Sequence, residues 1–289
     1  MKSIDPRRIE TASLSDVGRR RASNQDAFGG LVAGSGARLL VVADGMGGHA
    51  GGATASRLAV ETVEEAVGRS TGDPAWLLQT ALEAANRRVH AEAQSDPRLA
   101  GMGTTGVALL FPSGGGAWVA HVGDSRAYRL RDARLEQLTP DHSLVAEFER
   151  RGMITAEEAR VHPRRNEVLR CIGVDPEVDV DVAPLDVQPG DQYLLCSDGL
   201  CGVLDDEEIA AELLRAAPEV AARRLVDAAN ERGGPDNITV QIARIPAAAG
   251  RVGRTLEVLQ VRRASRPRVV ASIFAALVAL ALLWGLLQR

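Results

Sequence analysis

Short apolar segments alternate with polar turns along most of this chain. Each segment is rich in apolar or β-branched residues and is bounded by Gly, Pro or Asp, a pattern that predicts β-strands. The clearest of these segments are Leu39 to Ala43, Gly106 to Phe111, Trp118 to Val122, Tyr193 to Cys196 and Ile238 to Ile245. Strand-like sequence is densest between residues 103 and 138 and between residues 178 and 198.

Two early segments have a helical period instead. Residues Ala53 to Val67 place an apolar stripe on one face of a helix. Asp73 and Pro74 supply an N-cap and a first helical residue, which predicts a second helix that reaches about Gln94.

Two later helices are predicted from their start signals. Asp205 and Glu208 form a capping pair ahead of an apolar stripe, and Pro218 opens another helix. Because strands and helices do not simply alternate, the order predicts an α+β fold with antiparallel sheets flanked by helices.

Residues 141–173 are polar and charged and interrupt this order. Thr155 and Glu158 form a second capping pair there. Part of the segment is basic because it contains Arg160, Arg164 and Arg165. We expect a small flap, and the name is kept below for residues 141–173.

The far end of the chain has a different composition. Val269 to Leu287 is an uncharged run of 19 residues, close to the roughly 20 that cross a bilayer. Arginines stand directly before it, and the positive-inside bias places the preceding residues in the cytoplasm. We expect a single transmembrane helix at 269–287 that anchors the chain in the cell membrane. A buried core helix is the alternative interpretation.

The segment between this run and the last predicted strand is basic. Residues 246–268 carry six arginines and one glutamate and are expected to form a juxtamembrane linker. The N-terminus has charge but no apolar stretch after it, so no secretory signal is expected.

Composition narrows the class of protein. With 289 residues, 45% hydrophobic and 25% charged, the chain can bury one large core. A net charge of -4 gives no electrostatic reason to expect nucleic-acid binding. The 3 cysteines have no metal-ligand spacing, which favours reduced thiols and argues against zinc.

Four aspartates lie beside glycine or another small residue at the ends of predicted strands: Asp44, Asp124, Asp198 and Asp236. A lone Asp-Gly indicates only a turn. A buried carboxylate is costly unless a cation or another partner compensates. Brought together, these side chains would form an oxygen-rich pocket for hard divalent metals.

Six motifs follow one another between residues 21 and 240: Arg-x-x-x-Gln-Asp, Asp-Gly-Met-Gly-Gly-His, Gly-Thr-Thr, Val-Gly-Asp-Ser-Arg, Cys-Ser-Asp-Gly-Leu and Pro-Asp-Asn. In this order they resemble the metal-dependent PP2C-type (PPM) protein serine/threonine phosphatases in their bacterial form. The resemblance covers residues 10–245. It implies a phosphatase domain with a four-layer αββα sandwich, two Mn²⁺ or Mg²⁺ ions, and phosphoserine and phosphothreonine in proteins as substrates.

The resemblance also implies roles for single residues. Asp44 would bridge the two metals, and the backbone carbonyl of Gly45 would help to hold one of them. Asp198 and Asp236 would hold the other. Asp124, with Asp198, matches the position of a third metal, although Gly-Asp-Ser is also a common turn.

Three further residues carry open alternatives. Arg21 would pair two phosphate oxygens with its planar fork, or it is a surface arginine in a run of three. Asp26 either acts on a metal through a water or bonds a neighbouring backbone. His49 either protonates the leaving alkoxide through a water or makes a hydrogen bond at a helix start. Thr104 and Thr105 are expected to satisfy nearby backbone groups.

The chain departs from the family pattern at two positions. Gln25 stands where many members have a glutamate, which removes one carboxylate near the second metal. Met46 stands where some relatives place a histidine proposed as the general acid.

These features favour a membrane-tethered phosphatase that opposes Ser/Thr kinases at the inner face of the membrane. Its partners would be phosphorylated proteins, among them kinases and their substrates, and not nucleic acid. A catalytically silent phosphoprotein-binding relative is one alternative. A two-metal nuclease is another, but the dense basic stretch lies in the linker, away from the aspartates.

Overall fold

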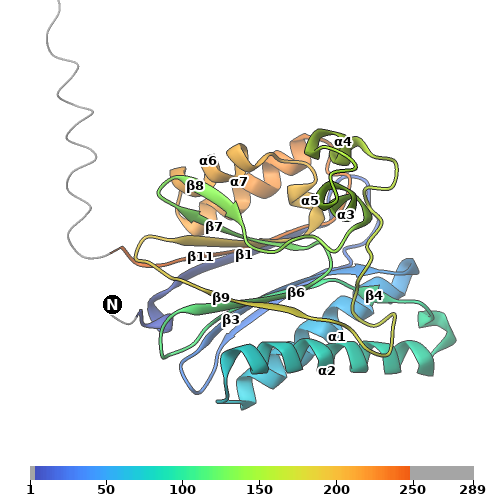
Figure 1. Cartoon of the computed structure of the whole chain (residues 1–289), viewed down its shortest axis with the longest axis horizontal. Coiled ribbons are helices and arrows are strands. Elements are labelled where there is room, and N and C mark those ends of the chain that lie inside the picture. Colours follow the sequence, from blue (N-terminus) through green and yellow to red (C-terminus); the bar gives the residue numbers. More distant parts are fainter. Residues whose placement is uncertain (1–3, 248–289) are drawn as a thin grey trace, which may run out of the picture. The chain divides into compact units, whose positions relative to one another are not determined.

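Two antiparallel β-sheets stack face to face in the computed structural model, which describes residues 4–247 (Figure 1). The first sheet has five strands, in the order β1 (Glu10–Asp16), β11 (Ile238–Arg244), β10 (Gln192–Cys196), β7 (Arg126–Arg131) and β8 (Arg134–Gln137). The second contains β2 (Asp26–Val32), β3 (Arg38–Met46), β5 (Gly106–Phe111), β6 (Ala117–Val122) and β9 (Asp181–Leu185), with the short β4 (Gly103–Thr104) paired to β3.

Helices cover the outer face of each sheet. The second sheet carries α1 (Gly48–Arg69) and α2 (Pro74–Ser95), and the first carries α5 (Asp198–Cys201), α6 (Asp206–Arg215) and α7 (Pro218–Glu231) (Figure 1). Two single 3₁₀ turns span Pro6–Arg8 and Pro97–Leu99. This arrangement confirms the expected pair of antiparallel sheets flanked by helices.

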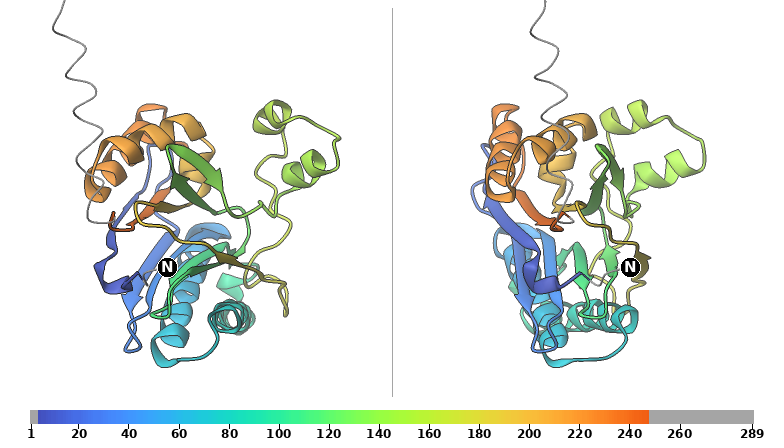
Figure 2. Two further views of the ribbon diagram at one scale, coloured as in Figure 1. Left: turned by 60° about the vertical axis from the view of Figure 1, so that its left-hand side comes forward. Right: turned by 90° about the vertical axis from the view of Figure 1, so that its left-hand side faces the viewer.

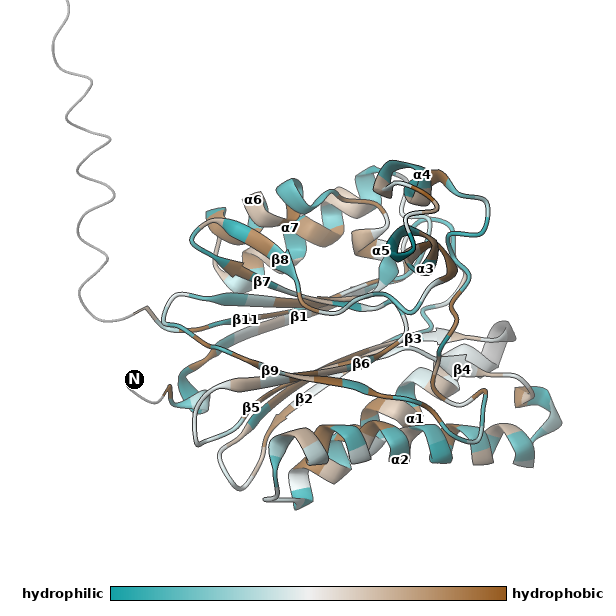
Figure 3. Cartoon of the chain, viewed as in Figure 1, coloured by the Kyte–Doolittle hydropathy of each residue, from teal (hydrophilic) through white to brown (hydrophobic). Residues whose placement is uncertain are grey.

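Apolar side chains fill the three spaces between these layers. One cluster joins the second sheet to α1 and α2, one joins the first sheet to α5, α6 and α7, and one lies between the sheets. In the last, the rings of Phe111 and Tyr193 meet edge-on with centroids 5.5 Å apart. Figure 3 shows hydrophobic residues along the strands and polar residues on the outer helix faces. The sheets therefore form a rigid support for the loops at their ends.

The helix start signals predicted from the sequence are present in the structure. Asp73 accepts a hydrogen bond from the amide of Trp76 at the start of α2, and Asp205 and Glu208 form a capping box. Pro218 begins α7. The five apolar segments predicted as strands form β3, β5, β6, β10 and β11.

Helix α1 begins at Gly48, five residues before the predicted start at Ala53. The early turn contains glycines, which have low helix propensity, so the apolar stripe does not reveal it. A Cβ on Gly52 would lie 2.7 Å from the carbonyl oxygen of Gly45. Glycine is needed there because the first turn packs directly on the end of β3.

The flap contains two short helices, α3 (Leu144–Arg150) and α4 (Ala156–Val161). Figure 2 shows them beside the stacked sheets rather than within them. Thr155 and Glu158 form the predicted capping box at the start of α4. Arg160 pairs with Asp205 at 2.6 Å and so links the flap to the start of α6.

Within residues 4–247, no helix combines the length and the apolar character that a membrane crossing needs. The predicted transmembrane helix at 269–287 lies outside the described residues, as does the linker from residue 248 onward. Both stay predictions.

Candidate metal centre

The aspartates from the sequence motifs converge at one end of the two sheets. Asp44 lies near the end of β3, Asp124 follows β6, Asp198 follows β10 as the first residue of α5, and Asp236 precedes β11. All four line one cavity of about 660 Å³, together with Gly45. Residues 38 to 192 positions apart in the sequence thus share one site because both sheets end there.

Asp26 lies directly opposite Asp44 in the antiparallel pair of β2 and β3. Its Oδ2 accepts a hydrogen bond from Ser197 Oγ at 2.7 Å. The same Ser197 Oγ accepts from the amide of Thr239 at 3.0 Å. Asp26 therefore joins the two sheets behind the cavity, and its observed partner is a serine side chain, not the neighbouring backbone.

Two threonine hydroxyls fix the backbone of Asp44. Thr104 Oγ1 donates to the Asp44 carbonyl at 2.8 Å, and the Asp44 amide donates to Thr105 Oγ1 at 2.9 Å. Thr105 Oγ1 also lies 2.7 Å from Ser125 Oγ. The expectation that these threonines satisfy nearby backbone is confirmed, and Thr105 connects Asp44 to the turn that holds Asp124.

Gly45 occupies a position that no other residue fits. A Cβ there would lie 2.1 Å from the Gly52 carbonyl oxygen and 2.5 Å from that of Gln25. The Gly45 amide donates to the same Gln25 carbonyl at 3.1 Å. The end of β3 is therefore enclosed by α1 on one side and the loop before β2 on the other.

Asn237 has a supporting role that the sequence analysis did not assign. Its Nδ2 donates to the carbonyls of Val17 and Ser23 at 2.9 and 3.0 Å, and its Oδ1 accepts from the amide of Gln25 at 2.8 Å. It thereby fixes the loop that carries Arg21. The signal available in the sequence was its place directly after Asp236 in the Pro-Asp-Asn motif.

Burial raises the pKa of the clustered carboxyl groups, and their mutual repulsion adds to the effect. The pKa of Asp26 rises to about 6 and that of Asp124 to about 7. The pKa values of Asp44 and Asp198 are also raised, mainly by burial and then by neighbouring aspartates. Each of these groups resists ionisation unless positive charge is supplied.

Two buried carboxylate oxygens, Asp26 Oδ1 and Asp198 Oδ1, have no hydrogen-bond partner among the described residues. Oxygen donors of this kind are the ligands that Mg²⁺ and Mn²⁺ prefer. The residues present therefore fit hard divalent cations.

Arg21 lies at the mouth of the same cavity, and its side chain is 53% exposed. Its guanidinium donates to Asp236 Oδ2 at 2.6 Å, and this hydrogen bond is the main cause of its raised pKa. Residues 166–168 of the flap line the cavity nearby. Carboxylate groups thus line the cavity and an arginine lies at its opening, an arrangement that suits an anion bound next to cations.

His49 lies in the first turn of α1, but its side chain is outside the described part of the structure. Met46, at the position where some relatives have a histidine, lines the cavity. The role proposed for His49 stays a prediction.

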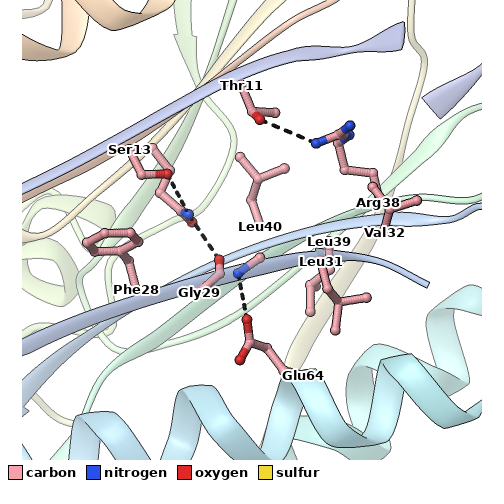
Figure 4. A pocket seen from close by; sticks show the side chains of 12 residues that line it. Thr11, Ser13, Phe28, Gly29, Leu31, Val32, Arg38, Leu39, Leu40 and Glu64 are labelled. Carbon is pink, nitrogen blue, oxygen red and sulfur yellow. Dashed lines mark hydrogen bonds between the residues drawn. The ribbon is translucent and has the colours of Figure 1, made fainter. Parts of the chain in front are cut away.

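A second cavity, of about 460 Å³, lies between the edges of the sheets at β1 and β2 (Figure 4). Its charged groups already have partners: Glu64 accepts from the amide of Gly30 at 2.7 Å, and Arg38 donates to the Pro6 carbonyl at 2.9 Å. It holds no convergent set of acids, so the aspartate cavity is the candidate centre.

A family model for protein phosphatase 2C matches residues 18–231. The chain belongs to this family. Its relatives in the protein phosphatase 2C family include serine/threonine protein phosphatase PstP of Mycobacterium tuberculosis, 42% identical over 240 residues. That match covers 82% of this chain, which spans 45% of the length of PstP. Serine/threonine phosphatase stp of Listeria monocytogenes is 39% identical over 234 residues, covering 78% of this chain and 92% of the relative.

Solved structures of the family share the fold. The crystal structure of M. tuberculosis PstP/Ppp has a TM-score of 0.76 at 40% identity, covering 82% of this chain and 99% of that one. A structure of the PstP catalytic domain in complex with two manganese ions has a TM-score of 0.72 at 38% identity, covering 82% of this chain and 98% of that one.

Proposed function

We propose that this chain is a metal-dependent phosphatase that hydrolyses phosphoserine and phosphothreonine in proteins. The observation that carries the proposal is the convergence of Asp44, Asp124, Asp198 and Asp236 on one cavity with Arg21 at its mouth. Membership of the protein phosphatase 2C family supports it, as does the presence of two manganese ions in the related PstP catalytic domain.

The resemblance to the family assigns the ligand set. Asp44 would hold both Mn²⁺ or Mg²⁺ ions, with the Gly45 carbonyl as a further ligand of one and Asp198 and Asp236 as ligands of the other. Asp124, which lines the same cavity as Asp198, would hold a third ion, and Asp26 would act through a water. When bound, the ions supply positive charge and a water activated near neutral pH.

The protein's own groups would bind and orient the substrate. Arg21 would leave Asp236 and pair two phosphate oxygens with its planar guanidinium, which neutralises the dianion. Asn237 holds the loop of Arg21 in place. His49 would donate a proton to the leaving serine or threonine oxygen through a water.

Phosphate release decides the function. The full chain with Mn²⁺ is expected to release inorganic phosphate from a phosphothreonine peptide, to stop when EDTA is added and to recover when Mn²⁺ is restored. A folded chain that binds Mn²⁺ and the peptide without releasing phosphate would instead be a silent phosphoprotein-binding relative. Activity that is insensitive to EDTA would reject the metal-dependent mechanism.

The cellular setting is a separate part of the proposal. We infer a C-terminal anchor at 269–287, a basic linker at 246–268 and a catalytic domain at the inner face of the cell membrane, where it would oppose Ser/Thr kinases. The support is the 19-residue uncharged run with arginines before it. The linker would add attraction to anionic lipid, about 1 kcal/mol per basic residue near the surface.

Fractionation tests the anchor. The full chain should sediment with membranes, and a chain that ends at Arg268 should stay in the supernatant. Leu280→Arg should release the full chain because a charge in the middle of the span is costly, whereas the matched Leu280→Ala should not. If the full chain and the shortened chain fractionate alike, the anchor is wrong.

A further inference from the structure

Two histidines and an aspartate form a group outside the aspartate cavity. His121 lies in β6, His142 follows β8, and Asp181 begins β9; one ligand atom from each lies within 4.8 Å of the others. Both histidines are buried, at 3% and 5% exposure. Their rings stack with centroids 4.4 Å apart. The group therefore needs a physical explanation of its own.

The hydrogen-bond directions do not suit a metal site. The amide of Gly123 donates to His142 Nδ1 at 3.1 Å, so Nδ1 is an acceptor and the neutral ring carries its hydrogen on Nε2. His142 Nε2 lies 3.4 Å from Asp181 Oδ2 and 3.2 Å from the guanidinium of Arg170. A histidine that binds a metal through one nitrogen normally donates a hydrogen bond from the other. His142 instead accepts one there. The guanidinium of Arg170, 2.6 Å from Asp181 Oδ1, already supplies a positive charge.

His142 is neutral at physiological pH. Burial and the neighbouring His121 ring lower the pKa of His142 to about 4. A neutral ring with its hydrogen on Nε2 has one lone pair, on Nδ1, and that lone pair is used by Gly123. The neutral His142 ring can thus accept a hydrogen bond from a backbone amide at Nδ1.

We propose that His142 is a positioning residue for Asp124. The His142 ring accepts from the amide of Gly123, and the His142 amide donates to the Gly123 carbonyl at 3.0 Å. Gly123 has a φ of 104°, so it turns the chain sharply directly before Asp124. Both peptide groups around this turn are held by one residue, which fixes the direction in which the Asp124 side chain leaves the backbone.

The neighbours of His142 reinforce the same turn. His121 Nε2 lies 2.8 Å from the carbonyl oxygen of Pro140. Arg126 donates to both carboxylate oxygens of Asp141, at 2.9 and 2.8 Å. Residues 139–142 are therefore attached to both sides of the turn at 123–125, and Asp124 lies in the middle of this contact.

His142, at the start of the flap, also holds the flap segment that lines the aspartate cavity. Its carbonyl accepts from the amide of Leu169 at 2.7 Å, directly after the flap residues 166–168 that line the aspartate cavity. The amide of Leu144 donates to the Glu167 carbonyl at 2.9 Å, which closes the base of the flap. The wall of the cavity and the Asp124 turn are thus anchored to the same residue.

This inference rests on the proposed metal centre and is tested by Mn²⁺ binding rather than by turnover. His142→Phe keeps a stacked ring but removes the acceptor for Gly123. The Mn²⁺ site in question is the one that Asp124→Asn removes. His142→Phe is expected to weaken Mn²⁺ binding at that site by roughly 10- to 100-fold, the range for residues that orient metal ligands. His142→Asn keeps an oxygen close to the Nδ1 position and should bind Mn²⁺ like the wild type.

Titration of the full chain with Mn²⁺, with free Mn²⁺ counted by electron paramagnetic resonance, gives the site affinities. In an Asp124→Asn background, His142→Phe should cause no further loss, because both changes act on one site. His90→Phe is the matched control, since His90 Nδ1 also lies near a backbone group, the Gly173 carbonyl at 3.2 Å, but that group is not part of the turn at 123–125.

The inference is overturned if His142→Phe binds Mn²⁺ like the wild type, if His142→Asn is as weak as His142→Phe, or if the losses from Asp124→Asn and His142→Phe add. It is also overturned if the wild type binds Mn²⁺ but has no site sensitive to Asp124→Asn, a result that leaves the proposed function intact. A wild type that binds no Mn²⁺ rejects the proposed function itself. If His142→Phe does not fold, the affinity of His142→Asn decides: wild-type binding supports the inference, and weak binding overturns it.

Discussion

Arg21 and Asp236 are paired to each other at 2.6 Å, so the residue proposed to bind phosphate is in contact with a residue proposed to bind a metal. With half of the Arg21 side chain exposed, such a pair contributes little to stability, about 0 to 1 kcal/mol. The ion pair between Arg21 and Asp236 can therefore break at a small cost in free energy. The arginine supplies a positive charge to Asp236 that a metal ion can replace, and the guanidinium then becomes available to an anion in the same cavity.

Arg21→Ala is expected to raise KM for a phosphothreonine peptide by about 10- to 100-fold, the equivalent of one lost charge-assisted, two-pronged contact. The turnover number should change less, because the carboxylates stay in place. The KM of Arg21→Lys should lie between that of the wild type and that of Arg21→Ala, since a lysine keeps the charge but cannot form the planar fork. Steady-state kinetics at saturating Mn²⁺ measure this. An unchanged KM in Arg21→Ala would show that Arg21 does not bind the phosphate.

Asp198→Asn should lower phosphatase activity on the order of 1,000-fold or more, as expected for loss of a charged group at a reacting centre. The metal-free variant should be at least as thermostable as the metal-free wild type, because burial and the charge of Asp236 disfavour the Asp198 carboxylate. Its Tm should also rise less on addition of Mn²⁺. Asp227→Asn, at an exposed site on α7, is the control and should match the wild type. A metal-free Asp198→Asn variant that melts well below the wild type would contradict this account.

The rise in Tm that Mn²⁺ causes should be larger at pH 7.5 than at pH 5.5. Burial raises the pKa of Asp26 to about 6 and that of Asp124 to about 7, from an unfolded value of 3.8. Between 3.8 and these values the folded, metal-free chain binds more protons than the unfolded chain, so it loses stability as the pH rises. Metal binding requires the protons to leave, and it therefore stabilises more at the higher pH.

The comparison with and without Mn²⁺ is needed because two histidines act in the opposite direction. Burial lowers the pKa of His121 and that of His142, the latter to about 4, from 6.5. Their contribution to stability is present above 6.5 and is lost as the pH falls, but it is common to both conditions. Thermal melts at both pH values with EDTA or excess Mn²⁺ isolate the carboxylates. A Mn²⁺ effect that is the same at both pH values would argue against protonated aspartates in the metal-free centre.

Local signals in the sequence predicted the elements that carry strong local chemistry. Apolar runs identified the central strands, and Asp73 and Pro218 marked helix starts because caps and proline act within one turn. The edge strands β1 and β2 were not among the named segments. Their residues are only partly buried and include Gly29 and Gly30, so neither a continuous apolar run nor a clear alternation appears.

Contacts between distant loops were the part that sequence reasoning could not supply. The shared motif order placed Asp44 and Asp198 in one site by resemblance, but no local pattern links Gly123 to His142 or Asn237 to the loop of Arg21. These contacts depend on how the two sheets stack. No spacing in the sequence marks His121 or His142, and only the direction of the Gly123 hydrogen bond distinguishes His142 from a packing residue.

Gly45→Ala should destabilise the chain by about 3 kcal/mol or more, at or above the upper end of the usual cost of overpacking, because the atoms in the way belong to the backbone. A Cβ there would lie 2.1 Å from the Gly52 carbonyl and 2.5 Å from the Gln25 carbonyl, and neither can move without displacing α1 or the loop before β2. Gly34→Ala is the matched control, because a Cβ on Gly34 meets no atom within 4 Å. Denaturant unfolding of the two variants measures the difference.

Mn²⁺ binding gives a second comparison of the same two variants. Because Gly45 directly follows Asp44, the Gly45→Ala variant should also lose Mn²⁺ affinity, even in the fraction that stays folded. Gly34→Ala should keep both its stability and its Mn²⁺ binding. Equal stability of the two variants would mean that the end of β3 can shift to accept a side chain, and the close packing inferred for Gly45 would then be wrong.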